Sequence, residues 1–137
     1  MIKIAFFDVD GTLLKLGSKV PSFQTVQTLQ QLQAKGILLC MATGRGYLSV
    51  PHFEGVDFDL WLTFNGSYVR SKDAVISKNP LDVDDKRRIL HNLKQMHRAA
   101  AISNEHFIVT NGTDPDLEQY FSCLLYTSPS PRDAHES

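Results

Sequence analysis

The sequence predicts an α/β fold, in which an incomplete doubly wound parallel sheet is followed by the start of a second, α+β domain. Within residues 1–80, short apolar runs alternate with amphipathic stretches, which is typical of parallel βα units. From Leu81 onward a charged amphipathic stretch replaces this pattern. The composition, with 42% hydrophobic and 21% charged residues, is that of an ordinary globular protein. We therefore expect one domain over 1–80 and part of another over 81–123.

The first domain opens with a strand over 2–7, which is apolar on both faces apart from Lys3 and is therefore expected to be buried. Ser22 can cap a helix that runs to about Lys35, and Gly36 is well placed to end it. The apolar positions of this helix repeat at helical spacing: Phe23, Val26, Leu29 and Leu32.

The rest of the first domain is predicted from two more apolar runs and a polar turn. We expect strands at 37–42 and 60–63, a short helix between Gly46 and about Pro51, and a hairpin that pairs 67–70 with 74–77 across 71–73. Trp61 is interpreted as a core residue and Cys40 as a small apolar filler beside the strand ends.

The second domain is expected to begin with a charged helix over 83–97, whose first turn is acidic. A strand over 106–110 and the start of a helix over 116–121 follow. Between them, the segment 111–116 superficially offers two carboxylates after a strand, but we interpret it as a turn that caps the next helix.

The last segment, 124–137, is dense in Ser and Pro and supports neither a helix nor a strand. It also resembles translated adapter sequence. We expect a non-native or disordered tail and exclude it from the prediction of the fold.

Charge and cysteine content exclude several classes of protein. The 14 basic and 15 acidic residues give a net charge of −1, which argues against a nucleic-acid or membrane-surface binder. Two cysteines cannot form a disulfide framework, and no Cys/His cluster has zinc spacing. The longest apolar stretch near the start is far too short for a membrane helix. We expect a cytoplasmic protein.

The most informative residues are Asp8 and Asp10, which follow the first predicted strand. Carboxylates at positions i and i+2 point to the same side, and ligands of parallel sheets bind beyond the carboxyl ends of the strands. Two carboxylates this close repel each other, so a hard divalent cation such as Mg²⁺ is expected to hold both ionised. One ionised aspartate can attack phosphorus to form an aspartyl-phosphate, and its neighbour can act as general acid and base. A calcium loop is the alternative, but it needs a further acidic residue and a final Glu, and this sequence has Leu13 and Leu14 instead.

Two more strand ends carry polar residues. Thr43, Gly44 and Arg45 follow the second predicted strand and can form a cradle for phosphate oxygens. Asn65 follows the third and offers an amide at the same edge of the sheet.

These residues carry a resemblance to a family. The run Asp8-Val9-Asp10-Gly11-Thr12 resembles the first motif of haloacid dehalogenase (HAD) superfamily phosphatases, and Ala42-Thr43-Gly44-Arg45 resembles the second. The segment 64–67 and the hairpin after it resemble the Cof-type branch (class IIB), whose cap domain is inserted after the third strand. The resemblance covers roughly 1–122 and implies a HAD-like Rossmannoid core with the start of an inserted cap.

Position by position, the resemblance implies roles for six residues. Asp8 would be the nucleophile and a Mg²⁺ ligand, and Asp10 would be the general acid and base, with its main-chain carbonyl also on the metal. Thr43 and the Gly44 backbone would bind the transferring phosphoryl group. Arg45 and Asn65 would be secondary contacts near the substrate.

The resemblance also implies an activity. The second aspartate favours a Mg²⁺-dependent phosphatase of small phosphorylated metabolites, because the dehalogenases of the family lack it and the transport ATPases carry Thr there. The family also needs a third motif with a Lys and a fourth motif of G-D-x-x-N-D type, both beyond the cap, and we find neither motif in this sequence. We therefore expect an N-terminal fragment with little activity of its own. Two alternatives share the fold: a phospho-accepting module of the receiver type, which would need an Asp at a later strand end, and a non-catalytic interaction module.

Overall fold

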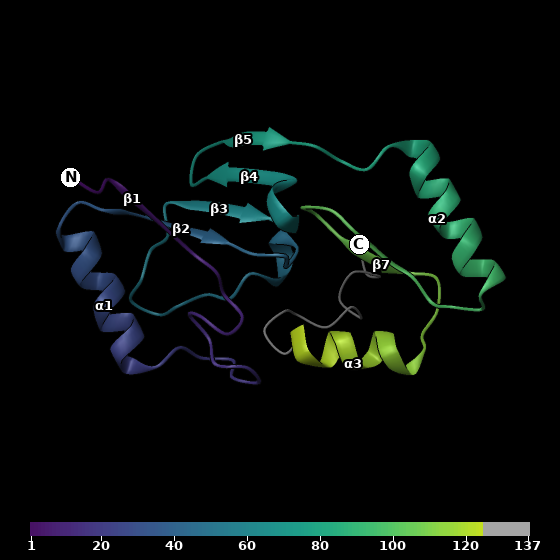
Figure 1. Ribbon diagram of the computed structural model, residues 1–137, viewed down its shortest axis with the longest axis horizontal. Helices are drawn as coiled ribbons and strands as arrows, with labels where there is room; N and C mark the ends of the chain where they lie inside the picture. The colour runs from purple at the N-terminus through teal and green to yellow at the C-terminus, as the bar shows by residue number, and fades with distance from the viewer. Residues whose placement is uncertain (125–137) are drawn as a thin grey trace, which may run out of the picture.

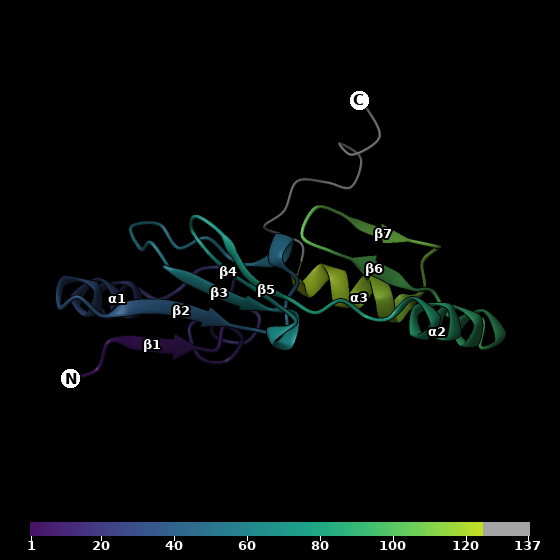
Figure 2. The same cartoon turned by 90° about the horizontal axis from the view of Figure 1, so that it is seen from above.

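The computed structural model of the protein describes residues 1–124, and the elements form two groups that lie side by side along the long axis (Figures 1 and 2). The first group holds β1 to β5 and α1, and the second holds α2, β6, β7 and α3. The division falls between β5 and α2, where the sequence pattern changes. The tail expected over 124–137 lies, from residue 125 on, outside the described residues.

Five strands form one sheet in the order β1-β2-β3-β4-β5. The strands are β1 (Ile4–Phe7), β2 (Leu38–Ala42), β3 (Leu60–Thr63), β4 (Tyr68–Ser71) and β5 (Val75–Lys78). The pairings of β1 with β2 and of β2 with β3 are parallel, and β4 and β5 continue the sheet as an antiparallel hairpin. The three strands and the hairpin predicted from the sequence are thereby confirmed, with ends that differ by one or two residues.

Helix α1 (Phe23–Ala34) connects β1 to β2 and begins and ends as predicted. The Ser22 side chain accepts a hydrogen bond from the Thr25 N–H at 3.1 Å, which satisfies one of the unpaired donors of the first turn. Gly36 follows the last turn with φ +74°, a left-handed conformation that glycine adopts at little cost. The short helix expected after Gly46 is a 3₁₀ turn over Tyr47–Ser49.

The core lies on one face of the sheet. Leu39 and Met41 of β2 are buried there against Leu29 of α1. The loop before β3 covers the remainder of that face with Phe53, Val56 and Phe58.

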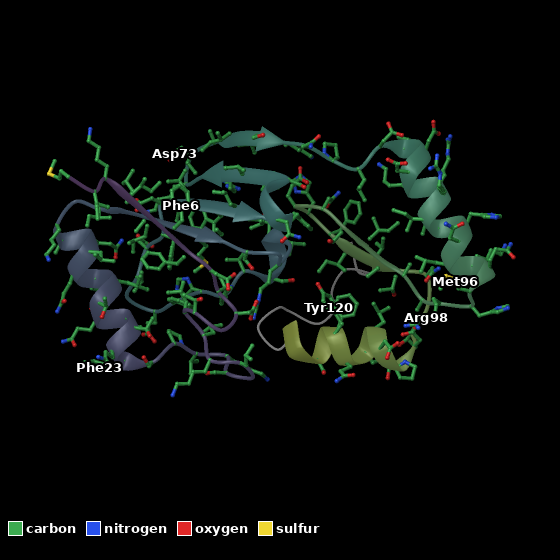
Figure 3. The ribbon with its side chains drawn as sticks, in the orientation of Figure 1. Phe6, Phe23, Asp73, Met96, Arg98 and Tyr120 are labelled. Carbon is green, nitrogen blue, oxygen red and sulfur yellow. The ribbon has the colours of Figure 1, made fainter. Side chains whose placement is uncertain are left out.

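The opposite face is open near β1. Phe6 is 57% exposed and Leu38, its neighbour on β2, is 46% exposed; Figure 3 labels Phe6 on its strand. The expectation that the first strand is buried on both faces is therefore wrong for the described chain, where every residue of β1 is partly or well exposed. Strand β1 lies at the edge of the sheet, and within residues 1–124 helix packing covers one face only.

The second group consists of α2 (Val83–Gln95), the antiparallel pair β6 (Ala101–Ser103) and β7 (Ile108–Thr110), and α3 (Pro115–Leu124). Strand β6 is absent from the sequence prediction, because its alanine-rich start lacks the β-branched residues that mark a strand. No helix among residues 1–124 is long and apolar enough to cross a membrane.

The segment 111–116 is a capping turn, as interpreted from the sequence. Asp114 accepts hydrogen bonds from the Leu117 N–H at 2.9 Å and the Ala99 N–H at 3.0 Å. Arg98, which Figure 3 labels beside the start of α3, donates to both Asp114 and Asp116. These two carboxylates therefore hold α3 to the preceding chain.

An ion pair connects the two groups of elements. The Lys78 Nζ atom at the end of β5 contacts the Glu105 carboxylate in the turn between β6 and β7. The Glu105 side chain is only 12% exposed, so water screens this pair less than it would a surface pair.

Candidate functional site

The carboxyl ends of β1, β2 and β3 meet at one edge of the sheet (Figure 1). Phe7 pairs in register with Met41, and Ala42 pairs with Leu62. The residues that follow these strands therefore leave the sheet side by side, beginning with Asp8 after β1 and Thr43 after β2. This is the arrangement expected from the rule that ligands bind beyond the carboxyl ends of parallel strands.

The loop after β1 exposes two carboxyl groups around a buried anchor. Asp8 and Asp10 are exposed, whereas Val9 between them is completely buried in the core. The Leu14 N–H donates to the Val9 carbonyl at 2.9 Å, and Gly11 turns the chain with φ +89°. Because Val9 points into the core, the loop presents both aspartates on its solvent side.

Main-chain hydrogen bonds connect the ends of β2 and β3. The Thr43 N–H donates to the Leu62 carbonyl at 2.9 Å, and the Asn65 N–H donates to the Thr43 carbonyl at 3.2 Å. The Phe64 N–H donates to the Arg45 carbonyl at 2.9 Å. These bonds bring Thr43, Arg45 and Asn65 into one corner.

Phe64 and Asn65 both have left-handed backbone conformations, with φ of 51° and 54°. Such conformations cost free energy in residues other than glycine and persist only where the surroundings enforce them. Here the two N–H bonds to Thr43 and Arg45 enforce the turn. A Cβ atom at Gly44 would lie 3.0 Å from the Asn65 Oδ1 atom, so glycine lets the Asn65 side chain lie against the loop that follows β2.

The Thr43 hydroxyl faces its own loop. The side chain is buried, and Oγ1 accepts a hydrogen bond from the Arg45 N–H at 3.1 Å. This bond uses one lone pair of the hydroxyl and leaves its O–H able to donate.

Arg45 connects the loop after β2 to the loop after β1. Its Nε donates to the Asp10 Oδ2 at 2.9 Å and its Nη2 donates to Oδ1 at 2.6 Å, so the guanidinium binds the carboxylate with both arms. Its Nη1 donates to the Ser49 carbonyl at 3.1 Å. The Arg45 side chain is 8% exposed and that of Asp10 is 45% exposed.

This pairing sets the protonation of Asp10. The hydrogen bonds from Arg45 are the main reason that the pKa of Asp10 is below its usual value; partial burial opposes them, and the positive charge of Arg45 supports them. Arg45 therefore favours the ionised form of Asp10 in the protein without substrate.

All six predicted site residues lie at the same edge of the sheet, and hydrogen bonds join Asp10, Thr43, Arg45 and Asn65. Asp8 is placed there by its strand and loop. The expected secondary contact between Arg45 and a substrate stays a prediction, since its guanidinium contacts Asp10 and Ser49 instead. The ion pair between Arg45 and Asp10 was not predicted from the sequence. The signal that could have indicated it is the presence of opposite charges at neighbouring strand ends.

The donor set at this edge suits a hard cation. Magnesium is commonly bound by one or two carboxylates, with water and a substrate phosphate completing its shell. Asp8 and Asp10 offer two carboxylates and adjacent main-chain carbonyls in an exposed loop. Within residues 1–124 no cluster of three or more acidic, His or Cys side chains could hold a metal ion. The oxygen donors thus fit magnesium held jointly with a substrate.

Comparisons with known proteins agree with this geometry. An HMP-PP phosphatase of Enterobacter sp. (strain 638) is 33% identical over 124 residues, which span 85% of this chain and 44% of that protein. The solved structure of BT1666, a HAD superfamily phosphatase from Bacteroides thetaiotaomicron, matches 89% of this chain and 46% of its own at 29% identity, with a TM-score of 0.74. The HAD subclass IIB sugar phosphatase BT4131 shares the fold, with a TM-score of 0.78 over 94% of this chain and 51% of its own at 22% identity.

The chain spans less than half the length of the curated relatives it matches. The family model of haloacid dehalogenase-like hydrolases matches residues 5–135, nearly the whole chain. Together with the shared fold and the aspartate loop at the end of β1, this match shows that the chain belongs to the haloacid dehalogenase-like hydrolase family.

Proposed function

We propose that the protein hydrolyses phosphate monoesters of small metabolites through a covalent aspartyl-phosphate on Asp8. The observation that carries this proposal is the meeting of three parallel strand ends, which gather Asp8, Asp10, Thr43 and Asn65 at one edge of a HAD-like sheet. The similarity to an HMP-PP phosphatase and to a sugar phosphatase supports a small phosphorylated substrate.

Each residue of the edge has a chemical task in this proposal. A carboxylate oxygen of Asp8 attacks phosphorus while the bond from phosphorus to the leaving oxygen breaks, and Asp10 in its protonated form donates a proton to that oxygen. Water then attacks the phosphoryl group and gives a proton to Asp10, so that inorganic phosphate leaves and both aspartates return to their starting state. The Thr43 hydroxyl and the Gly44 N–H donate hydrogen bonds to the phosphoryl oxygens.

The Asp8 carboxylate and the Asp10 main-chain carbonyl would hold Mg²⁺, because Arg45 already binds both oxygens of the Asp10 carboxylate. When bound, the ion neutralises negative charge on the phosphoryl oxygens. We further propose that residues 1–137 alone turn over slowly. An aspartate pair without a third acidic partner would hold Mg²⁺ weakly, and without the third-motif Lys the negative charge of the phosphoryl group would be less well neutralised.

A receiver-type module is less well supported. In that class the Asp that becomes phosphorylated lies at a later strand end, whereas the residues after β2 and β3 here include Thr43 and Asn65 but no Asp. A non-catalytic module would need no exposed aspartate pair.

The test is the Asp8→Asn substitution in the protein expressed from its complete reading frame. Release of inorganic phosphate from a generic phosphomonoester is measured with and without Mg²⁺. We expect Asp8→Asn to lower turnover at least about a thousandfold, because the nucleophile is lost. The matched control is Asp73→Asn, in the exposed β4–β5 turn at the opposite end of the sheet (Figure 3), which should keep full activity. Activity that survives in Asp8→Asn would refute covalent catalysis by this residue.

A further inference from the structure

Arg45 has an unusual environment for a cation beside a substrate-binding edge. Its side chain is 8% exposed, and each of its three guanidinium nitrogens donates to a protein oxygen. A residue that binds substrate directly is expected to keep its charged group toward solvent. The contacts of Arg45 instead run to Asp10 and to the Ser49 carbonyl.

The main chain of Arg45 is fixed as firmly as its side chain. Its N–H donates to the Thr43 Oγ1 atom at 3.1 Å, and its carbonyl accepts from the Phe64 N–H at 2.9 Å. Arg45 is therefore anchored to the ends of β2 and β3. From this anchored position its guanidinium reaches the exposed loop that carries Asp10.

The two-armed contact constrains the Asp10 carboxylate. A planar guanidinium that bonds both carboxylate oxygens fixes the plane of the carboxyl group as well as its distance. Each oxygen keeps a second lone pair, and the Asp10 side chain is still 45% exposed. The carboxylate is thus held in one orientation while it stays accessible to a bound substrate.

We propose that Arg45 is a positioning residue, whose guanidinium holds the Asp10 carboxyl group in the orientation from which, once protonated, it transfers a proton to the leaving oxygen. This inference rests on the proposed phosphatase function. Proton transfer requires the donor and the leaving oxygen to lie within hydrogen-bonding distance, so a carboxyl group that rotates freely transfers protons less often. Arg45 would act on the reaction through Asp10 and not through contact with the phosphate.

The test is a double-mutant cycle in the protein from its complete reading frame, with Arg45→Met, Asp10→Asn and the double variant. Turnover is measured with an alkyl phosphate, whose leaving oxygen needs a proton, and with p-nitrophenyl phosphate, whose leaving group departs without one. We expect Arg45→Met to lower kcat for the alkyl phosphate at least about tenfold and to change KM less than about twofold. The loss should be much smaller with p-nitrophenyl phosphate. In the Asp10→Asn background, Arg45→Met should cause no further loss.

Two more variants keep the test decisive. Arg45→Lys keeps the charge and most of the side chain, so this variant should fold even where Arg45→Met does not. It should show the same dependence on the leaving group as Arg45→Met, because an ammonium cannot bond both carboxylate oxygens in one plane. Arg87→Met removes an exposed arginine from α2 and should leave both activities unchanged.

A rise in KM that persists in the Asp10→Asn background would overturn the proposal in favour of direct contact with the substrate. An equal loss with both substrates would also overturn it, because a loss of folded protein lowers both rates alike. Failure of the phosphatase proposal itself has a different signature, namely activity that survives in Asp8→Asn.

Discussion

Adjacent leucines on β2 offer a direct test of how the sheet that carries the site is covered. Leu38 and Leu39 point to opposite faces, and their exposed fractions are 46% and 0%. The substitutions Leu38→Ala and Leu39→Ala remove the same atoms from the same strand. Differences in β propensity therefore cancel, and the two free energies of unfolding report on the two faces.

The expected magnitudes follow from burial. Leu→Ala removes about three methylene-sized groups, each worth about 0.8 kcal/mol when fully buried. At Leu38, where about half of the side chain is buried and no closed cavity forms, this gives about 1.3 kcal/mol. At Leu39 the loss of burial and the cavity together cost about 2–5 kcal/mol. We expect Leu39→Ala to be more destabilising by at least about 1 kcal/mol.

Urea unfolding of this chain, followed by fluorescence, measures both values. Trp61 is the only tryptophan of the sequence and packs against the core beside Met41, so its emission reports on this sheet. Equal destabilisation by the two substitutions, or a larger effect at Leu38, would refute the description of a sheet whose second face is open at Leu38.

Two further predictions concern titratable groups. The pKa of Asp114 is lowered, mainly by hydrogen bonds from the Leu117 and Ala99 N–H groups. Asp114 therefore stabilises the fold at pH values above its usual pKa of 3.8, and this contribution is lost as the pH falls below that value. Hydrogen exchange should show that the protection of these two amides falls with acid, and Asp114→Asn should remove that dependence. Burial raises the pKa of the Cys40 thiol to about 11, so alkylation of Cys40 at neutral pH should require unfolding, and rapid labelling of the folded chain, located by peptide mass, would contradict its burial.

Much of the fold could be predicted from the sequence because apolar periodicity and capping are local. Ser22 and Gly36 bound α1 as expected, and the runs at 37–42 and 60–63 are strands. The apolar run over 2–7 does not by itself reveal the edge position of β1, because strand order depends on tertiary pairing; only the family resemblance, in which later strands flank the first, indicates an exposed edge there. Strand β6 escaped prediction since alanine carries little strand signal.

The candidate site, like the fold, has one part that the sequence predicts and another that it does not. Its place at one edge of the sheet follows from the general behaviour of parallel strands, so Asp8, Thr43 and Asn65 could be predicted as neighbours. The pairing of Arg45 with Asp10 depends on how deeply one long side chain is buried and which way it turns, and no spacing rule contains that information. The left-handed turn at Phe64 and Asn65 was equally hidden, because neither residue requires it.

The position of β1 has a consequence for the chemistry of Asp8. Within residues 1–124 this strand is hydrogen-bonded to β2 alone, so its outer N–H and C=O groups are available to one more strand. A strand that joined there in parallel would end level with Phe7 and deliver its next residues to the outer flank of Asp8. Thr43 and Gly44 already occupy the inner flank. The identity of the outer neighbour would thus decide which functional groups meet the nucleophile from the second side.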